Sequence, residues 1–494
     1  MTDVDAGAMR DHGRNRRAMD AGYRAASAHR TMRRSRSSPA TAANWRLWVS
    51  GGFLAIAIIF GGGGTPSPST ELVVELAALA AIVAWAWLAA KDRRYSTIEV
   101  DRPLFLVAAL VVAVPLLQLV PLPPAIWHNL PGREGEVQAL ALVGGDNAWM
   151  PLSLSPPRTI ASALALIPPV AMLFMTLRLR GRDRQRLVGV FAALGVLAAV
   201  VGVVQLASGN ANWLRFYPGS EGGFATGFQA NRNADADVLL IAAMGLVAWW
   251  KGGGEFRNLR QAPSVVAALL VFLLLSVVLT GSRTGVVLIL VAAVASAAMI
   301  LRIMATKNRR VIAAVLLSVV VVGGSVYFLS GNARVQRTLT RFGSEDAVRP
   351  EIWKDTIYAI GQYWPAGSGV GTFQPVFAAA ERLEFVRPDF SNRAHNDYLE
   401  FALEAGIVAP VVLLVVVIFA AVRLKRLLSG ADSGKQRTVG ILVLGAFLVL
   451  LFHSLVDYPE RSLSLAVVSG MMGGLLGRGW SGGGRRSDLR ELEG

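Results

Sequence analysis

Long uncharged apolar runs recur along most of this chain and restrict its fold more than any other feature. Such runs, when they approach or exceed roughly 17 residues, can cross about 30 Å of hydrocarbon as a helix. We find twelve, at 47–63, 70–90, 103–120, 159–177, 187–207, 235–250, 264–280, 285–301, 311–330, 398–422, 438–456 and 462–477. Apolar residues make up 53% of the 494 residues and charged residues only 17%, which is too little polar surface for a soluble globule. The sequence therefore predicts an all-α integral membrane protein with about 12 transmembrane helices.

The positive charge is divided unevenly between alternate loops. If the amino terminus is cytoplasmic, 35 of the 49 Lys and Arg residues fall in inward segments. Eight of the other 14 lie in the long outer loop 331–397, which is near neutral because it also carries eight acidic residues. Every short loop then obeys the positive-inside rule. We expect both termini in the cytoplasm, and the formal charge of +16 reflects this topology and not nucleic-acid binding.

The chain divides into a membrane domain and two tails. Residues 1–46 are rich in Arg, Ala and Ser without apolar periodicity, which predicts a disordered basic cytoplasmic tail. Residues 47–478 form the expected membrane domain, and 479–494 a second cytoplasmic tail. The first run resembles a signal peptide, but no clear cleavage site follows it, so an uncleaved helix is expected. The absence of cysteine excludes disulfides and thiolate chemistry.

Ionisable side chains avoid the centres of the predicted helices and gather at their outer ends. The group comprises Glu71, Glu75, Asp235, Asp237, Arg283, His395, Asp397, Glu400, Glu404, His453 and Asp457. A charge at the bilayer centre costs at least ~2.5 kcal/mol, so charges are retained there only for a reason. The i, i+4 spacing puts Glu400 and Glu404 on one helical face, with Asp397 roughly on the same face. Because all these residues lie on the outer side of the membrane, we expect a polar site that faces outward. The alternative for any single residue is that its side chain snorkels to the membrane interface.

Four local patterns and one later segment occur in a characteristic order. They are GFATGFQANRN at 223–233, GSRTG at 281–285, RPEIWKDTIYAIGQYWPAGSGVGTF at 349–373, SNRAHNDYLEFALEAGI at 391–407 and FHSLVDYPER at 452–461. In this order they resemble the O-antigen ligase and polymerase family of membrane glycosyltransferases, over about residues 215–460. The resemblance implies metal-independent transfer of a glycan without a cofactor, from a polyprenyl pyrophosphate carrier at the periplasmic face of the bacterial inner membrane. The implied acceptor is another glycan or the lipid A core, in contact with membrane lipid and without nucleic acid.

Arginine suits the leaving group of this reaction, because its planar fork binds phosphate oxygens bidentately and stays charged beside lipid. Arg283, at a helix-to-helix turn, is the first candidate for binding the pyrophosphate, with an interfacial anchor as the alternative. Arg232 and Arg215 are candidates for a second contact. Many family members place an arginine where this chain has Phe224, so the second contact stays open. Arg349, at the start of an amphipathic segment of the large loop, is a candidate for binding phosphate or sugar.

His395 is the candidate general base, since an ordinary imidazole accepts a proton near neutral pH. Asp397, Glu400 or the nearby Arg393 are expected to set its tautomer and orientation. The alternative is a helix-capping histidine. His453 with Asp457 is interpreted first as a structural hydrogen bond at the end of another helix, and otherwise as support for the active site.

Other functional classes remain open at this stage. Asp235 and Asp237 alternate across a helix, so no compact set of metal ligands is evident. A lipid-linked oligosaccharide flippase or another transporter would share the helix count, but it would predict related halves and charges at the midplane. Within the enzyme class, a ligase, a polymerase and transfer onto protein all need the same cation and base.

Overall fold

The computed structural model describes residues 45–64, 68–91, 101–210, 213–217, 223–252, 263–303, 348–386, 391–429 and 434–477. These residues are predominantly helical, with one sheet of two short strands among them, which confirms the predicted all-α class. The predicted segment 311–330, the first part of the large loop and nearly all of both tails lie outside the described residues.

The described part contains seven spans long and apolar enough to cross a membrane. These are α3 (Pro68–Lys91), α7 with α8 (Pro156–Leu164 and Ile167–Arg178), α9 (Gly181–Ala207), α10 (Arg232–Gly252), α13 (Arg283–Ile303), α19 (Val408–Ser429) and α20 (Gly434–His453). Shorter apolar helices are α2 (Trp45–Phe60), α4 (Arg102–Gln118), α12 (Pro263–Leu279) and α21 (Leu463–Leu475). The chain is therefore a multi-pass membrane protein.

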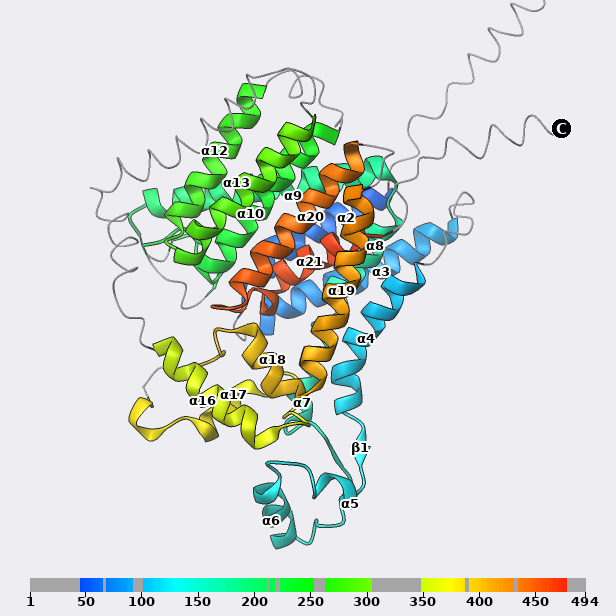
Figure 1. Ribbon diagram of the computed structural model, residues 1–494, viewed down its shortest axis with the longest axis vertical. Coiled ribbons are helices and arrows are strands. Elements are labelled where there is room, and N and C mark those ends of the chain that lie inside the picture. The colour runs from blue at the N-terminus through cyan, green and yellow to red at the C-terminus, as the bar shows by residue number, and fades with distance from the viewer. Residues whose placement is uncertain are drawn as a thin grey trace, which may run out of the picture. The chain divides into compact units, whose positions relative to one another are not determined.

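Helix α10 forms the centre of the helical packing, since it contacts α9, α12, α13 and α20 (Figure 1). Small residues permit this closeness. A Cβ at Gly195 of α9 would collide with Ala242 of α10, and one at Gly470 of α21 would collide with the Pro169 carbonyl of α8. In a membrane, where lipid tails are as apolar as leucine, close backbone approach through small residues is a main source of helix association.

Two predicted segments are each interrupted in the structure. The segment 398–422 divides into α18 (Asp397–Ala405) and α19, because Gly406 takes φ +55° and ends the first helix. The segment 159–177 divides into α7 and α8 at Ala165 and Leu166. Pro168 and Pro169 lie in the first turn of α8, where a missing N–H leaves no hydrogen bond unmade.

The remaining elements are short and lie at one end of the membrane helices (Figure 1). They are β1 (Pro121–Leu122), α5 (Pro124–Trp127), α6 (Glu134–Leu142), β2 (Met150–Pro151), α16 (Val348–Tyr363), α17 (Phe373–Ala380), η2 (Leu383–Phe385) and η3 (Pro459–Arg461). Helices α16, α17 and α18 share a small core of their own that includes Phe373, Phe377 and Leu403. The HNDYLE segment lies against the end of α20, where the Tyr398 hydroxyl donates to the Leu451 carbonyl.

Candidate active site

His395 lies in a constrained turn directly before α18. Its φ of +50° is in the left-handed region, which non-glycine residues rarely adopt and which costs of order 1–3 kcal/mol. The turn is held on both sides. The Trp353 indole donates a 3.0 Å hydrogen bond to the Ala394 carbonyl, and the Asn396 side chain accepts from the Tyr398 and Leu399 amides as the helix cap.

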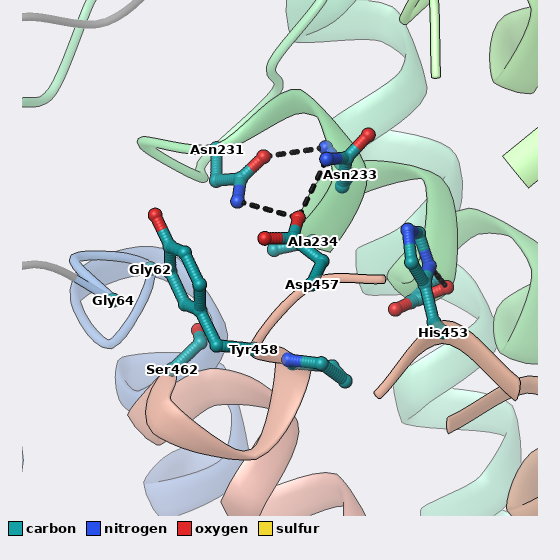
Figure 2. A pocket seen from close by; sticks show the side chains of 11 residues that line it. Gly62, Gly64, Asn231, Asn233, Ala234, His453, Asp457, Tyr458 and Ser462 are labelled. Atoms are coloured by element: carbon teal, nitrogen blue, oxygen red, sulfur yellow. Dashed lines mark hydrogen bonds and ion pairs between the residues drawn. The ribbon is translucent and has the colours of Figure 1, made fainter. Parts of the chain in front are cut away.

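The ring of His395 contacts a carboxylate from a distant segment. Its Nδ1 lies 3.1 Å from Oδ1 of Asp457, and the side chain keeps 27% of its surface exposed. The other oxygen of Asp457 accepts hydrogen bonds from the side-chain amide groups of Asn231 and Asn233, at 2.9 and 2.5 Å (Figure 2). Burial opposes the charge of Asp457, but the His395 hydrogen bond and the charges of His395, His453 and Arg349 outweigh it and lower its pKa.

A second histidine–carboxylate pair lies behind the first. His453 Nδ1 is 2.6 Å from Oδ1 of Asp237, and both side chains are almost completely buried. Together with Asn231, Asn233 and Asp457 they line a small cavity of about 10 Å³, room for one water molecule (Figure 2). The pair joins α10 to α20 and lines the same small cavity as Asp457.

Three carboxylates of α18 converge on Arg461 of η3. Its guanidinium is 2.8 Å from Glu404, 3.5 Å from Glu400 and 3.6 Å from Asp397. Glu400 also accepts from Arg393 and from the Ala394 amide. The predicted shared face of Asp397, Glu400 and Glu404 is confirmed by this common contact. Glu400, held by Arg461 and Arg393, thereby fixes the backbone at Ala394, directly before His395.

Two of the candidate arginines, Arg215 and Arg232, contact Phe224. Arg215 donates to the Phe224 carbonyl at 2.7 Å, and the Arg232 guanidinium lies 4.6 Å from the centre of the Phe224 ring. The same ring closes against Gly281, two residues before Arg283. The candidate arginine group, Arg215, Arg232 and Arg283, thus has two members in contact with Phe224.

The comparison with known families agrees with this geometry. Residues 268–414 match the model described as O-Antigen ligase. This part of the chain is therefore similar to the O-antigen ligase family. No individual curated protein matches the chain. The match to the O-antigen ligase family covers Arg283, Arg349 and His395, and it ends before Asp457.

The structure alters the expectation about which group orients the His395 ring. Asp397 and Glu400 were expected to orient the ring, but Asp457 contacts it instead, because Asp397 and Glu400 face Arg461 and Arg393. Asn231 and Asn233 were not recognised from the sequence as carboxylate partners. Their only signal was that they flank Arg232 in the ANRN run.

The site has the parts of a base-catalysed displacement. A histidine with a buried carboxylate partner can take up a proton, and guanidinium groups can stabilise charge on a departing phosphate. In the sequence, Arg232 of the arginine group stands between Asn231 and Asn233, the two asparagines that hold Asp457. The candidate base and the candidate phosphate-binding residues are therefore connected through one short segment at the start of α10. Within the described ranges, no three His, Asp or Glu side chains are grouped as metal ligands.

Proposed function

We propose that this chain transfers a glycan from a polyprenyl pyrophosphate carrier to a hydroxyl group of an acceptor, at the periplasmic face of the bacterial inner membrane. The observation that carries the proposal is the His395–Asp457 contact, made beside the asparagines that flank Arg232. The similarity of residues 268–414 to the O-antigen ligase family supports the same reaction class.

In the proposed reaction the acceptor oxygen attacks the anomeric carbon as the bond from that carbon to the pyrophosphate breaks. The acceptor proton passes to Nε2 of His395, because Nδ1 faces Asp457. The negative charge that develops on the pyrophosphate is stabilised by Arg283 with Arg232 or Arg215, and Arg349 is assigned to the sugar or phosphate. The configuration at the anomeric carbon inverts, since one displacement occurs.

Asp397, Glu400 and His453 have positioning roles in this proposal. Glu400 holds Arg393 and the Ala394 amide, so it keeps the His395 turn in place. His453 is paired with Asp237, and its carbonyl accepts from the Asp457 backbone amide. None of the three receives the acceptor proton.

The proposal is tested by the surface and lipid-linked glycans of a deletion strain, separated by size and attachment. Complementation with wild type and with His128→Ala should restore the profile, whereas His395→Ala should not, at equal protein level in the membrane. His128 is the matched control because it lies in a separate loop beside α5. A fully active His395→Ala variant would remove the assigned base.

The same experiment separates the open alternatives. Polymer that persists on the polyprenyl carrier while the lipid A core stays bare indicates a ligase, and accumulation of single repeat units indicates a polymerase. An unchanged profile contradicts glycan transfer and favours a transporter. Arg283→Gln should lower the affinity for undecaprenyl pyrophosphate, measured by titration of the purified protein, roughly 10- to 100-fold, as expected when a charge-assisted contact is lost. Unchanged affinity would exclude Arg283 from the donor site.

A further inference from the structure

A buried glutamine in the last turn of α9 holds the loop between α9 and α10. The side chain of Gln205 is 2% exposed. Its Nε2 donates to the carbonyls of Leu214 and Gly227, each at 2.8 Å. Its Oε1 accepts from the backbone amides of Thr226 and Gly227, at 3.1 and 3.2 Å. The donor end and the acceptor end of one side-chain amide thus join two separate stretches of this loop.

Arg215 of the arginine group belongs to the same hydrogen-bond network. Its guanidinium donates to the Thr226 hydroxyl and to the Phe224 carbonyl, both at 2.7 Å. It also lies 3.4 Å from Oε1 of Gln205. The ring of Phe224 in turn contacts the guanidinium of Arg232. A movement of the loop at Thr226 would therefore displace Arg215 directly, and Arg232 through Phe224.

The backbone of this loop is held in conformations that need support from outside. Leu214 has φ +53° and Gly227 has φ +52°, both in the left-handed region. Leu214 is not a glycine, so its conformation is unfavourable and persists only where the surroundings impose it. The carbonyls of both residues accept from the Gln205 amide group. One side chain thus stabilises both unusual turns.

The loop also lies close against a membrane helix. A Cβ at Gly202 of α9 would approach the Ala225 Cβ to 3.0 Å, and a Cβ at Gly227 would approach the Ala198 carbonyl of α9 to 3.0 Å. On its other side, the Ala225 amide donates to the Leu279 carbonyl at the end of α12. Rigid elements of the scaffold therefore set the position of the loop, as is common for loops that carry binding residues.

The end of the loop that leads to the candidate base is held by different residues. The Ala230 amide donates to the Gly62 carbonyl, and the Gln229 side chain accepts from the Ser464 hydroxyl at 2.6 Å. Both contacts come directly before the asparagine pair that holds the carboxylate of the site. The hydrogen bonds of Gln205 within the described residues lie earlier in the loop, so the arginine end and the base end are fixed separately.

We propose that Gln205 is a positioning residue for the donor substrate. It sets the loop so that the arginine group meets the pyrophosphate, and it acts through Arg215 and Phe224 without touching the donor itself. A loop that is ordered before binding loses less freedom when the ligand arrives, so its support raises the affinity for the donor more than the rate of the chemical step. This inference rests on the proposed glycan transfer, and Gln205 lies outside residues 268–414, the range that matches the O-antigen ligase family.

The test compares Gln205→Met with Gln185→Met in the purified full chain. Methionine keeps the unbranched shape of the side chain and removes its amide hydrogen bonds. Gln185 is the matched control, because it lies in the same helix and its side chain donates to the Ala248 carbonyl, far from the loop. Titration with undecaprenyl pyrophosphate should show roughly 10-fold weaker binding by Gln205→Met and wild-type binding by Gln185→Met. Equal affinity of the two variants would overturn the proposal.

Steady-state kinetics separate positioning from a general loss of structure. Gln205→Met should raise KM for the donor roughly 10-fold, while kcat at saturating donor and KM for the acceptor stay near wild type. Partial misfolding would instead lower kcat through the amount of active protein and leave the donor KM unchanged. A lower kcat with a wild-type donor KM would therefore contradict the positioning role.

Hydrogen–deuterium exchange provides a measurement that does not depend on activity. The amides of Thr226 and Gly227 donate to Gln205, so both should exchange faster in Gln205→Met and at the wild-type rate in Gln185→Met. Equal exchange in both variants would show that Gln205 does not hold the loop.

A variant of the loop itself tests the same network without a change in α9. Thr226→Val is nearly isosteric and removes the hydroxyl that accepts from Arg215. It should weaken the binding of undecaprenyl pyrophosphate by roughly 3-fold, since one hydrogen bond is lost. Wild-type affinity of Thr226→Val would contradict the role of the network, also in the case that Gln205→Met does not fold.

The wild-type titration distinguishes this inference from the proposed function. Wild type that does not bind undecaprenyl pyrophosphate would contradict the proposed donor and this inference with it. Wild type that binds it no more tightly than Gln205→Met would overturn the role of Gln205 alone.

Discussion

Nδ1 of His395 lies 3.1 Å from Oδ1 of Asp457, although 62 residues separate the two in the chain. Asn231 and Asn233 hold the second oxygen of Asp457, so the carboxylate cannot rotate away from the ring. A carboxylate accepts only, which makes Nδ1 the protonated nitrogen and leaves Nε2 as the base. The pair explains how a surface-accessible histidine is kept in one tautomer.

Replacing Asp457 with asparagine should lower the transfer rate while the protein remains folded. An amide oxygen would accept from Asn231 and Asn233, so its NH₂ group would face His395 and favour the wrong tautomer. We expect a loss of roughly 10²- to 10⁴-fold in kcat with little change in KM, the range of general base catalysis. The measurement is glycan transfer by purified protein, and wild-type kcat would contradict the role of this pair.

Arg461 should contribute more to stability than Arg382, although both contact several carboxylates. Arg461 is 17% exposed and its partners Glu400 and Glu404 are fully buried, so Arg461→Met leaves Glu404 without its cation and Glu400 with Arg393 alone. Loss of one partner from a buried pair costs about 3–5 kcal/mol. Arg382 is 40% exposed and only one of its partners, Asp355, is buried, so Arg382→Met should destabilise the protein less than Arg461→Met. Thermal unfolding in detergent compares the two, and equal midpoints would contradict the difference.

The stability of the protein should depend on pH through Asp397. Burial, assisted by the charge of Glu400 and opposed by Arg461, raises the pKa of Asp397 from 3.8 to about 7. Between pH 4 and 7 the folded protein retains a proton that the unfolded chain has released, so the free energy of unfolding falls as pH rises through this window.

The Asp397→Asn variant isolates this effect, because its amide cannot ionise. Its unfolding midpoint should match that of wild type near pH 4 and exceed it by a few degrees at pH 8. Asp146→Asn, in an exposed loop, is the control and should follow wild type at every pH. A constant offset between Asp397→Asn and wild type would show that its titration does not affect stability.

Gly406 should tolerate no side chain, because it has φ +55° and a Cβ there would collide with the Pro365 carbonyl. Gly406→Ala should destabilise the protein by at least roughly 1–3 kcal/mol, the cost of a left-handed non-glycine residue. Gly361 is the matched control, since it is helical and has open space around it. Gly361→Ala should be neutral or slightly stabilising. Equal unfolding midpoints for the two variants would refute this prediction.

The class of the protein and part of its site were accessible from the sequence. Apolar runs of bilayer length must form helices, because lipid offers no partners for free backbone groups. The common face of Asp397, Glu400 and Glu404 follows from helical spacing alone, and their shared partner Arg461 agrees with it. The ordered motifs also identified the family that the match at residues 268–414 supports.

Only the tertiary structure decided which distant groups meet. A hydropathy run measures composition over a window, so it does not detect that Gly406 ends α18 inside an apolar segment. The pairing of His395 with Asp457 and the contacts of Arg215 and Arg232 with Phe224 depend on how helices cross. Crossing is set by close contacts between small residues of different helices, such as Gly195 with Ala242, and local periodicity carries no information about these partners.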